Sequence, residues 1–214
     1  MKKSVNLSVW DFANIQQEWK KLPKKEKKRI QSYTRKEVEQ LPASSAALGS
    51  SEYWHVRLDA AFVLHYHHNP IQRHEAAFAL GAFTYRDELE KSLAVKHLRY
   101  TMRYDPSIVA RHEAIEALGS PNTFCILSVS AAADMTKINY LWPDYKDVQA
   151  TAEETFDNII TWLKKMKYDD VVQELLQWKR LPRLHIPEGI LTGDLNEARH
   201  IYQQSTNMKG GKKK

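Results

Sequence analysis

The sequence predicts an all-α fold made of stacked helix pairs, and three observations support this prediction. A nine-residue motif at positions 73–81 recurs at positions 111–119, apolar residues between the copies follow helical spacing, and the chain includes only seven Gly and eight Pro. Apolar residues spaced three and four apart form one stripe along a helix, which must be buried against a neighbouring helix. A helical fold is therefore favoured over a sandwich or barrel, which would need many turns.

The repeated motif sets the predicted architecture. It occurs as RHEAAFALG at 73–81 and as RHEAIEALG at 111–119, identical at seven of nine positions. A further step of the same length reaches QATAEETF at 149–156, where Ala150 and Thr151 replace His and Glu. A period of about 40 residues with helical patterning is typical of two-helix solenoid repeats. We therefore predict a HEAT-like helical-repeat solenoid over residues 51–180, with a degenerate third copy.

The expected elements alternate between an outer helix and a helix that carries the motif. Asn69 and Pro70 end one helix and open the first motif helix, which ends near Gly81. Asp105-Pro106-Ser107 marks the start of the second motif helix, and Gly119 marks its end. The other helices are expected over residues 52–68, 87–103, 123–139, 144–165 and 169–180. A loop over 181–193 and a short helix over 194–204 are expected to follow.

The two ends of the chain are more basic than its middle. Residues 1–50 hold 11 basic and 5 acidic residues, within a net charge of +6 for the chain. We expect a basic N-terminal helical hairpin over 8–41, divided at Pro23, and a linker over 42–51. Residues 181–208 are expected to form a loop and a helix, and 209–214 a disordered lysine tail. Nucleic-acid binding is not favoured, because no zinc finger or helix-turn-helix signature accompanies the basic residues.

Several classes of protein are excluded by the composition. No apolar run reaches the roughly 18 residues that a membrane span needs, and the N-terminus lacks the apolar segment of a secretory signal. The single cysteine, Cys125, excludes an internal disulfide framework and lies in an apolar stretch, so we expect it to be buried. These features favour a cytoplasmic protein without a membrane partner.

The pairs His74-Glu75 and His112-Glu113 carry the most chemical information. Adjacent helical residues point about 100° apart, so each pair offers an imidazole and a carboxylate to one edge of its helix. Equivalent helices of consecutive repeats lie roughly 10 Å apart. Two inward imidazoles can then share one ion, with bonds of about 2.0–2.2 Å. Two imidazoles and one or two carboxylates, without thiolate, favour Fe or Mn over structural Zn, although Zn remains an alternative.

These residues also have competing interpretations. A zincin would need a second His at i+4, where Phe78 and Glu116 stand instead. Packing alone is the simpler alternative, because solenoid repeats duplicate residues for packing. Histidine is a poor core residue, however, and it recurs here together with Glu. The cluster His65, His67 and His68 is a second candidate ligand set, for which a polar helix end is the expected role.

The two motifs resemble those of deoxyhypusine hydroxylase, a HEAT-repeat non-haem diiron monooxygenase. The resemblance covers residues 52–120 and is carried by RHE with LG at 73–81 and by VARHEA with EALG at 109–119. It implies that His74, His112 and Glu113 are iron ligands. Glu75 would be a further ligand, or a catalytic carboxylate that orients the substrate. The implied function is an oxygen-activating hydroxylase with Fe(II)/Fe(III) in a dinuclear centre.

The chain departs from this family in the number of motifs. The family carries four His-Glu motifs and this chain carries two, since neither His185 nor His200 is followed by Glu. A homodimer that joins two half-sites would restore a dinuclear centre, and we favour this arrangement. A monomer would instead hold a single iron, or the site would be a relic on a non-catalytic HEAT-repeat protein-binding scaffold. The basic N-terminal hairpin would suit an acidic protein partner or substrate.

Overall fold

The computed structural model describes residues 12–46, 50–138 and 144–180. Within these ranges the chain is helical and contains no strand, which confirms the all-α prediction. The helices, in chain order, are α1 (Phe12–Lys21), α2 (Lys24–Gln31), α3 (Arg35–Glu39), α4 (Leu41–Ala46), α5 (Ser50–Tyr66), α6 (Pro70–Ala82), α7 (Glu88–Tyr104), α8 (Ile108–Leu118), α9 (Ser128–Met135), α11 (Lys146–Lys165) and α12 (Asp169–Arg180). None of them combines the length and the apolar character that crossing a membrane requires.

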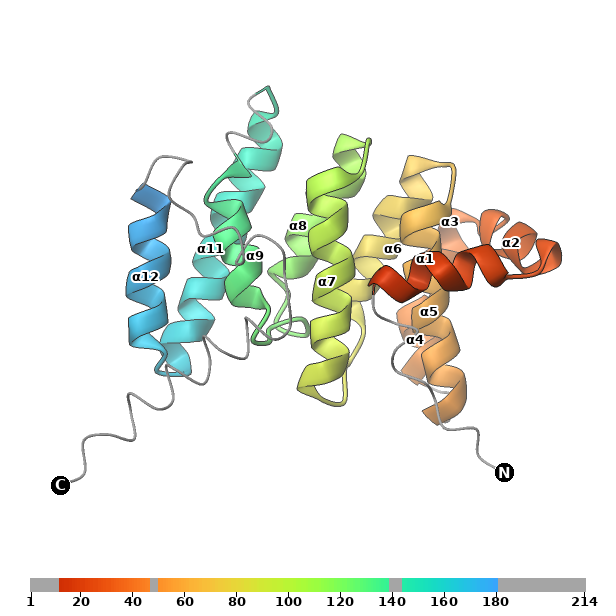
Figure 1. The fold of residues 1–214 in the computed structure, drawn as a ribbon, viewed down its shortest axis with the longest axis horizontal. Coiled ribbons are helices and arrows are strands. Elements are labelled where there is room, and N and C mark those ends of the chain that lie inside the picture. Colours follow the sequence, from red (N-terminus) through yellow and green to blue (C-terminus); the bar gives the residue numbers. More distant parts are fainter. Residues whose placement is uncertain (1–11, 47–49, 139–143, 181–214) are drawn as a thin grey trace.

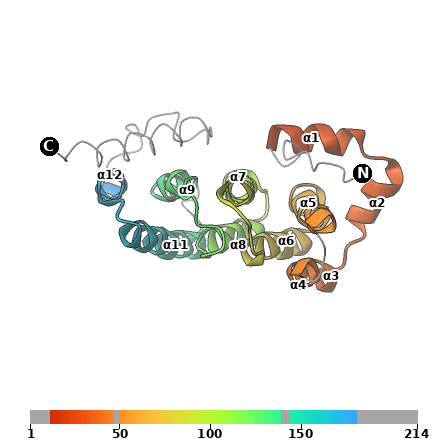
Figure 2. The same cartoon turned by 90° about the horizontal axis from the view of Figure 1, so that it is seen from below.

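The central helices form two layers (Figure 1). Figure 2 shows α5, α7 and α9 in one row and α6, α8 and α11 in the other. Within the second row, α6 packs against α8 and α8 packs against α11. The rows are connected as three consecutive helix pairs, α5–α6, α7–α8 and α9–α11, while α3 packs against α6 at one end and α12 against α9 and α11 at the other. The two motif helices are therefore neighbours in the same layer.

The second row keeps the repeat step of the sequence. Pro70, Ile108 and Lys146 are the first residues of α6, α8 and α11. Close contacts recur along the row, because Gly81 faces Ala117 and Gly119 faces Thr155. The degenerate copy at 149–156 therefore occupies the register of the two motif copies.

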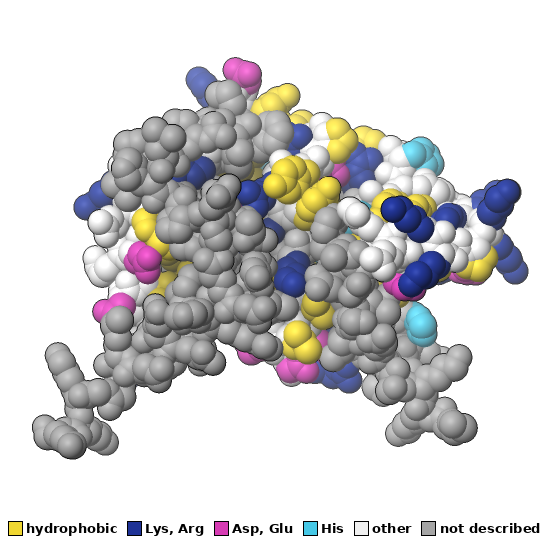
Figure 3. All heavy atoms as spheres, in the orientation of Figure 1, with side chains coloured by type: hydrophobic (Ala, Val, Ile, Leu, Met, Phe, Trp, Pro, Cys, Tyr) yellow, Lys and Arg dark blue, Asp and Glu magenta, His cyan; other side chains and the backbone are white. Residues whose placement is uncertain are grey.

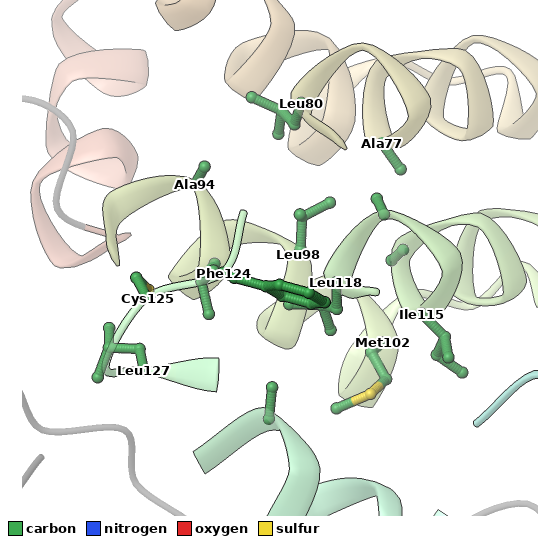
Figure 4. Close-up of a cluster of buried hydrophobic side chains, with 14 of the residues drawn as sticks. Ala77, Leu80, Ala94, Leu98, Met102, Ile115, Leu118, Phe124, Cys125 and Leu127 are labelled. Atoms are coloured by element: carbon green, nitrogen blue, oxygen red, sulfur yellow. The ribbon is translucent and has the colours of Figure 1, made fainter. Parts of the chain in front are cut away.

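The hydrophobic core lies between the two layers (Figure 4). Leu80 of α6, Leu98 and Met102 of α7 and Leu118 of α8 are completely buried there. Each such side chain contributes about 1.5–3 kcal/mol by leaving water. Cys125 is buried in the same cluster, as expected, and burial raises the pKa of its thiol to about 11.

Buried ion pairs connect successive helices. Arg73 of α6 donates to Asp105 from Nε at 2.8 Å and from Nη2 at 3.0 Å, and both side chains are almost completely buried. Arg57–Glu90 and Arg99–Asp134 are buried pairs of the same kind, each joining one helix pair to the next. Removing one partner leaves a buried charge without its counterion, at a cost of roughly 3–5 kcal/mol. These pairs therefore fix how one helix pair sits on the next.

The N-terminal region differs from the prediction. The expected hairpin contains a further helix, α3, because Thr34 and Glu37 form a capping box that starts a new helix after α2. The linker predicted over 42–51 is wrong, since α4 covers Leu41–Ala46 and α5 begins at Ser50. Pro42 is compatible with α4 because the first turn of a helix needs no N–H from that residue. Leu41 is buried and anchors the segment.

The outer helix predicted over 123–139 is also shorter than expected. Helix α9 begins only at Ser128. Thr123 Oγ1 donates to the carbonyl of Ala117 at 2.8 Å, and Ser128 Oγ accepts from the amide of Cys125 at 3.0 Å. Such side-chain bonds to the backbone compete with helix formation. The predictions for the loop at 181–193, the helix at 194–204, the tail at 209–214, His185 and His200 lie outside the described residues.

Candidate metal centre

The two His-Glu pairs occupy equivalent places on neighbouring helices. His74 and His112 are each the fifth residue of their helix, because α6 starts at Pro70 and α8 at Ile108. Asn69 fixes the start of α6, where its Oδ1 accepts from the amide of Ile71 at 2.9 Å. Since α6 packs against α8, the two pairs lie on adjacent helices, and His74 of the first reaches Glu113 of the second.

The His74 imidazole lies between two carboxylates. Its Nε2 is 3.1 Å from Oε2 of Glu113, and its Nδ1 is 3.2 Å from Oε1 of Glu75. Nδ1 is buried, and among the described residues it has no hydrogen bond of good geometry. The side chains of Glu75 and Glu113 are only 5% and 8% exposed, whereas that of His74 is 26% exposed. Both carboxylates are thus buried on either side of the imidazole, which is itself partly exposed.

A third glutamate joins the second pair. The potential ligand atoms of His112, Glu113 and Glu116 all lie within 4.8 Å of one another. His112 Nε2 is 4.0 Å from Oε1 of Glu116, one helical turn further along α8. Glu116 was not among the predicted site residues, because its position was considered only as the place of a zincin histidine. The signal was present in the sequence, since residues three and four apart share a helix face.

The crowding of carboxylates changes the acidity of Glu113. Burial, and then repulsion from and hydrogen bonding with Glu116, raise the pKa of Glu113 to about 7, with a smaller contribution from the charge of Glu75. A carboxyl group in such surroundings is ionised less readily than usual, and a bound cation would reverse the effect. The α6–α8 interface is therefore an electrostatically favourable place for a positive ion.

Glu75 has a cationic partner from outside the two motifs. Nε of Arg35, the first residue of α3, lies 2.9 Å from Oε1 of Glu75 and 2.7 Å from Oε1 of Glu39. The capping box of Thr34 and Glu37 fixes the start of α3 and hence the position of Arg35. Glu75, predicted to be a ligand or catalytic residue, is therefore held by an arginine. Of the other three predicted residues, His74 approaches Glu113, and His112 and Glu113 cluster with Glu116.

The spacing of these donors can be compared with the spacing of ligands on a divalent transition metal. Two ligands about 2.1 Å from one ion lie about 3.0 Å apart when they are at right angles and about 4.2 Å apart when they are opposite. The 3.1 Å between His74 Nε2 and Glu113 Oε2 matches the first value. The spread of 4.8 Å among His112, Glu113 and Glu116 is slightly wider than the second. As it stands, this set on α8 is more open than a closed coordination shell.

The other candidate histidines have different partners. His65 Nε2 and His97 Nδ1 share a hydrogen bond of 2.8 Å between α5 and α7. His68 Nδ1 lies 2.7 Å from Oε1 of Gln31, and His67 Nδ1 accepts from the amide of Asn69 at 3.1 Å. The contacts of His67 and His68 lie at the helix end, which is the role expected for the cluster, whereas His65 contacts His97 between α5 and α7, which was not expected.

The degenerate third copy contributes no imidazole or carboxylate at the equivalent place. Thr151, at the position of Glu113, donates from Oγ1 to the carbonyl of Asp147 on its own helix at 2.9 Å. In the described part of the chain the donor set is thus confined to α6 and α8, with Arg35 at its border. In comparisons with known proteins, no family model, no curated protein and no solved structure matches this chain.

Proposed function

We propose that this protein is an iron-dependent, oxygen-activating monooxygenase or hydroxylase similar to deoxyhypusine hydroxylase. The observation that carries the proposal is the approach of His74 Nε2 to Glu113 Oε2 across the α6–α8 interface, at 3.1 Å. Residues from two separate repeats thereby meet with the spacing of ligands on one ion. His112 and Glu116 extend the donor set on α8.

The proposed scaffold is a HEAT-like helical-repeat solenoid. It is supported by three consecutive helix pairs and by motif helices that start at Pro70, Ile108 and Lys146. Stacked repeats hold equivalent residues on one face, which gives a rigid surface for a shared site. The same stacking explains why two short motifs, separated by one full repeat, can act together.

The residues have distinct roles in this proposal. His74, His112 and Glu113 would hold the metal, which supplies the activation of dioxygen when iron is bound. Glu116 balances charge at the open edge of the set. Glu75 lies 3.2 Å from His74 Nδ1, where a small ring rotation lets it accept the Nδ1 proton. A carboxylate at that nitrogen leaves the Nε2 lone pair facing the ion, and Arg35 holds the carboxylate in place.

The proposal also specifies how many ions each chain holds and how many chains form one centre. One chain supplies two imidazoles and the buried Glu113, which suits one ion per chain. A dinuclear Fe(II)/Fe(III) centre would then join the sites of two chains in a homodimer with two-fold symmetry. Mn and Zn are the alternative metals for these donors.

Metal content and solution mass test the proposal together. Protein loaded with Fe(II) under anaerobic conditions and desalted is expected to retain one iron per chain by elemental analysis. His112→Ala is expected to lose it, and His55→Ala, which removes an exposed histidine of α5, is expected to keep it. Light scattering gives the number of chains in the loaded species. Absence of stoichiometric metal from the wild-type protein would refute the metal-dependent function.

A second candidate function is a non-catalytic protein-binding scaffold. Ile71 and Phe78 of α6 and Val109 of α8 are 40 to 48% exposed and flank the two motifs on their helices. Lys and Arg side chains also gather at the end of the molecule formed by α1 and α2 (Figure 3), where α2 has the sequence KKEKKRIQ. This charge would favour an acidic partner. The scaffold alternative predicts partner binding that is unchanged by His112→Ala and by chelators.

A further inference from the structure

We infer that Arg35 is a built-in cation that occupies the place of a second metal ion at Glu75, so that each chain holds a single ion. This inference rests on the proposed metal-binding function and specifies the number of ions that one chain accepts. It starts from the two motifs, which place one imidazole-carboxylate pair on each of two neighbouring helices. In the described part of the chain, the pair on α8 has a further acidic ligand on its own helix, and the pair on α6 has an arginine instead.

The position of the guanidinium is that of a shared counterion. Arg35 Nε lies 2.9 Å from Oε1 of Glu75 on α6 and 2.7 Å from Oε1 of Glu39 on α3. Oε1 of Glu75 is also 3.2 Å from Nδ1 of His74. Two carboxylates, one from α3 and one from α6, thus meet the same guanidinium, and carboxylates are ligands that bind divalent ions such as Mn²⁺.

The charges also indicate that the residues of α8 balance a metal ion and that Arg35 balances Glu75. Glu113 and Glu116 face each other and together balance one divalent ion. Glu75, only 5% exposed, is balanced by Arg35. A buried carboxylate without a counterion must take up either a cation or a proton, because burial penalises its ionised form. Removal of Arg35 therefore opens a second cation site between the carboxylates of Glu39 and Glu75, while His74 keeps its Nδ1 proton and binds the first ion through Nε2.

Arg35 can be removed without disturbing the fold. Its side chain is 63% exposed, and it lies at the first position of α3, which is fixed by Thr34 and Glu37 rather than by Arg35. Alanine is compatible with that helical position. Lys36 is the matched control, because it is exposed, carries the same charge and is the next residue of the same helix.

The experiment measures metal per chain at about pH 7.5, above the usual pKa of an imidazole, with excess Mn²⁺ or anaerobic Fe²⁺ as the probe, followed by desalting and elemental analysis. The wild-type protein and Lys36→Ala are expected to retain one ion per chain, and Arg35→Ala two. The double variant Arg35→Ala/Glu75→Gln is expected to return to one, since the second ion depends on the Glu75 carboxylate. Circular dichroism confirms that each variant is folded.

Each other outcome has a defined meaning. Two ions in the wild-type chain, or one ion in both the wild type and folded Arg35→Ala, would overturn the role of Arg35 and leave the metal-dependent function intact. A second ion that persists in the double variant would place it away from Glu75 and also overturn the inference. No metal in the wild type would refute the proposed function itself.

Discussion

Gly81 of α6 lies so close to Ala117 of α8 that a Cβ atom on Gly81 would stand 2.8 Å from the Ala117 Cβ and 3.0 Å from its Cα. Real Cβ atoms do not approach other carbons so closely, and the Ala117 Cα belongs to a backbone that cannot rotate away. This contact sets the separation of the two helices that carry the His-Glu pairs. The glycine that ends the motif thus has a packing role.

Gly81→Ala is expected to destabilise the protein. The added methyl group must push α6 away from α8, at a cost of about 1–3 kcal/mol, which exceeds the roughly 1 kcal/mol gained from better helix propensity. Thermal unfolding should show a lower Tm. Ala117→Gly in the same chain should restore part of the loss by making room for the methyl group. If Gly81→Ala is as stable as the wild type, the close approach of the helices does not exist.

The pair of His65 and His97 is expected to make stability depend on pH. Burial, and then the neighbouring His97, hold the pKa of His65 well below its usual value of 6.5. Below about pH 6.5 the unfolded chain therefore binds a proton that the folded chain does not. The free energy of unfolding should fall as the pH decreases from that value, by up to about 1.4 kcal/mol per pH unit for this group.

Urea unfolding between about pH 5 and pH 7.5 checks this dependence on both sides of the usual imidazole pKa. His65→Gln cannot titrate and should show a shallower decline on the acid side. His55→Gln, at an exposed position of α5, should decline like the wild type. Equal slopes in all three proteins would show that His65 does not cause the dependence.

Glu113→Gln is expected to stabilise the metal-free protein at high pH. The folded-state pKa of Glu113, about 7, is above its usual value of 4.5, so its ionisation costs stability as the pH rises through 7. Glutamine removes that cost, and we expect a gain of about 1–2 kcal/mol at about pH 8 that disappears near pH 5. The same variant should lose its metal. Unfolding curves of chelator-treated protein at both pH values test the gain, and a loss of stability at the higher pH would contradict it.

Arg73→Leu is expected to cost far more than loss of an exposed ion pair. It leaves the buried carboxylate of Asp105 without its bidentate partner, at a cost of about 3–5 kcal/mol. Lys91→Ala removes the surface pair with Glu88 and should cost less than about 1 kcal/mol. Denaturant midpoints compare the two variants. Similar small losses would show that the Arg73–Asp105 pair does not fix the packing of the repeats.

Local signals in the chain were enough to predict the second row of helices and its repeat step. The spacing of the two motifs and the turn signals at Pro70 and Gly119 predict the second row of helices, because such signals act within a few positions of one another. The linker predicted over 42–51 was wrong, because this segment begins with the helix Leu41–Ala46. Leu41 is buried against the rest of the protein, and no pattern in the neighbouring sequence predicts that burial. Local periodicity predicts which residues form a helix, but burial of an individual side chain depends on what packs against it.

Packing between helices determines which side chains meet at the candidate site. The recurrence of an unusual residue pair at the repeat period singled out His74, Glu75, His112 and Glu113. No sequence pattern indicated that Arg35, on a helix well before the first motif, holds the Glu75 carboxylate, or that Glu116 completes the cluster on α8. Such contacts depend on how far each helix is rotated and how closely it packs, and these quantities are set by the whole core.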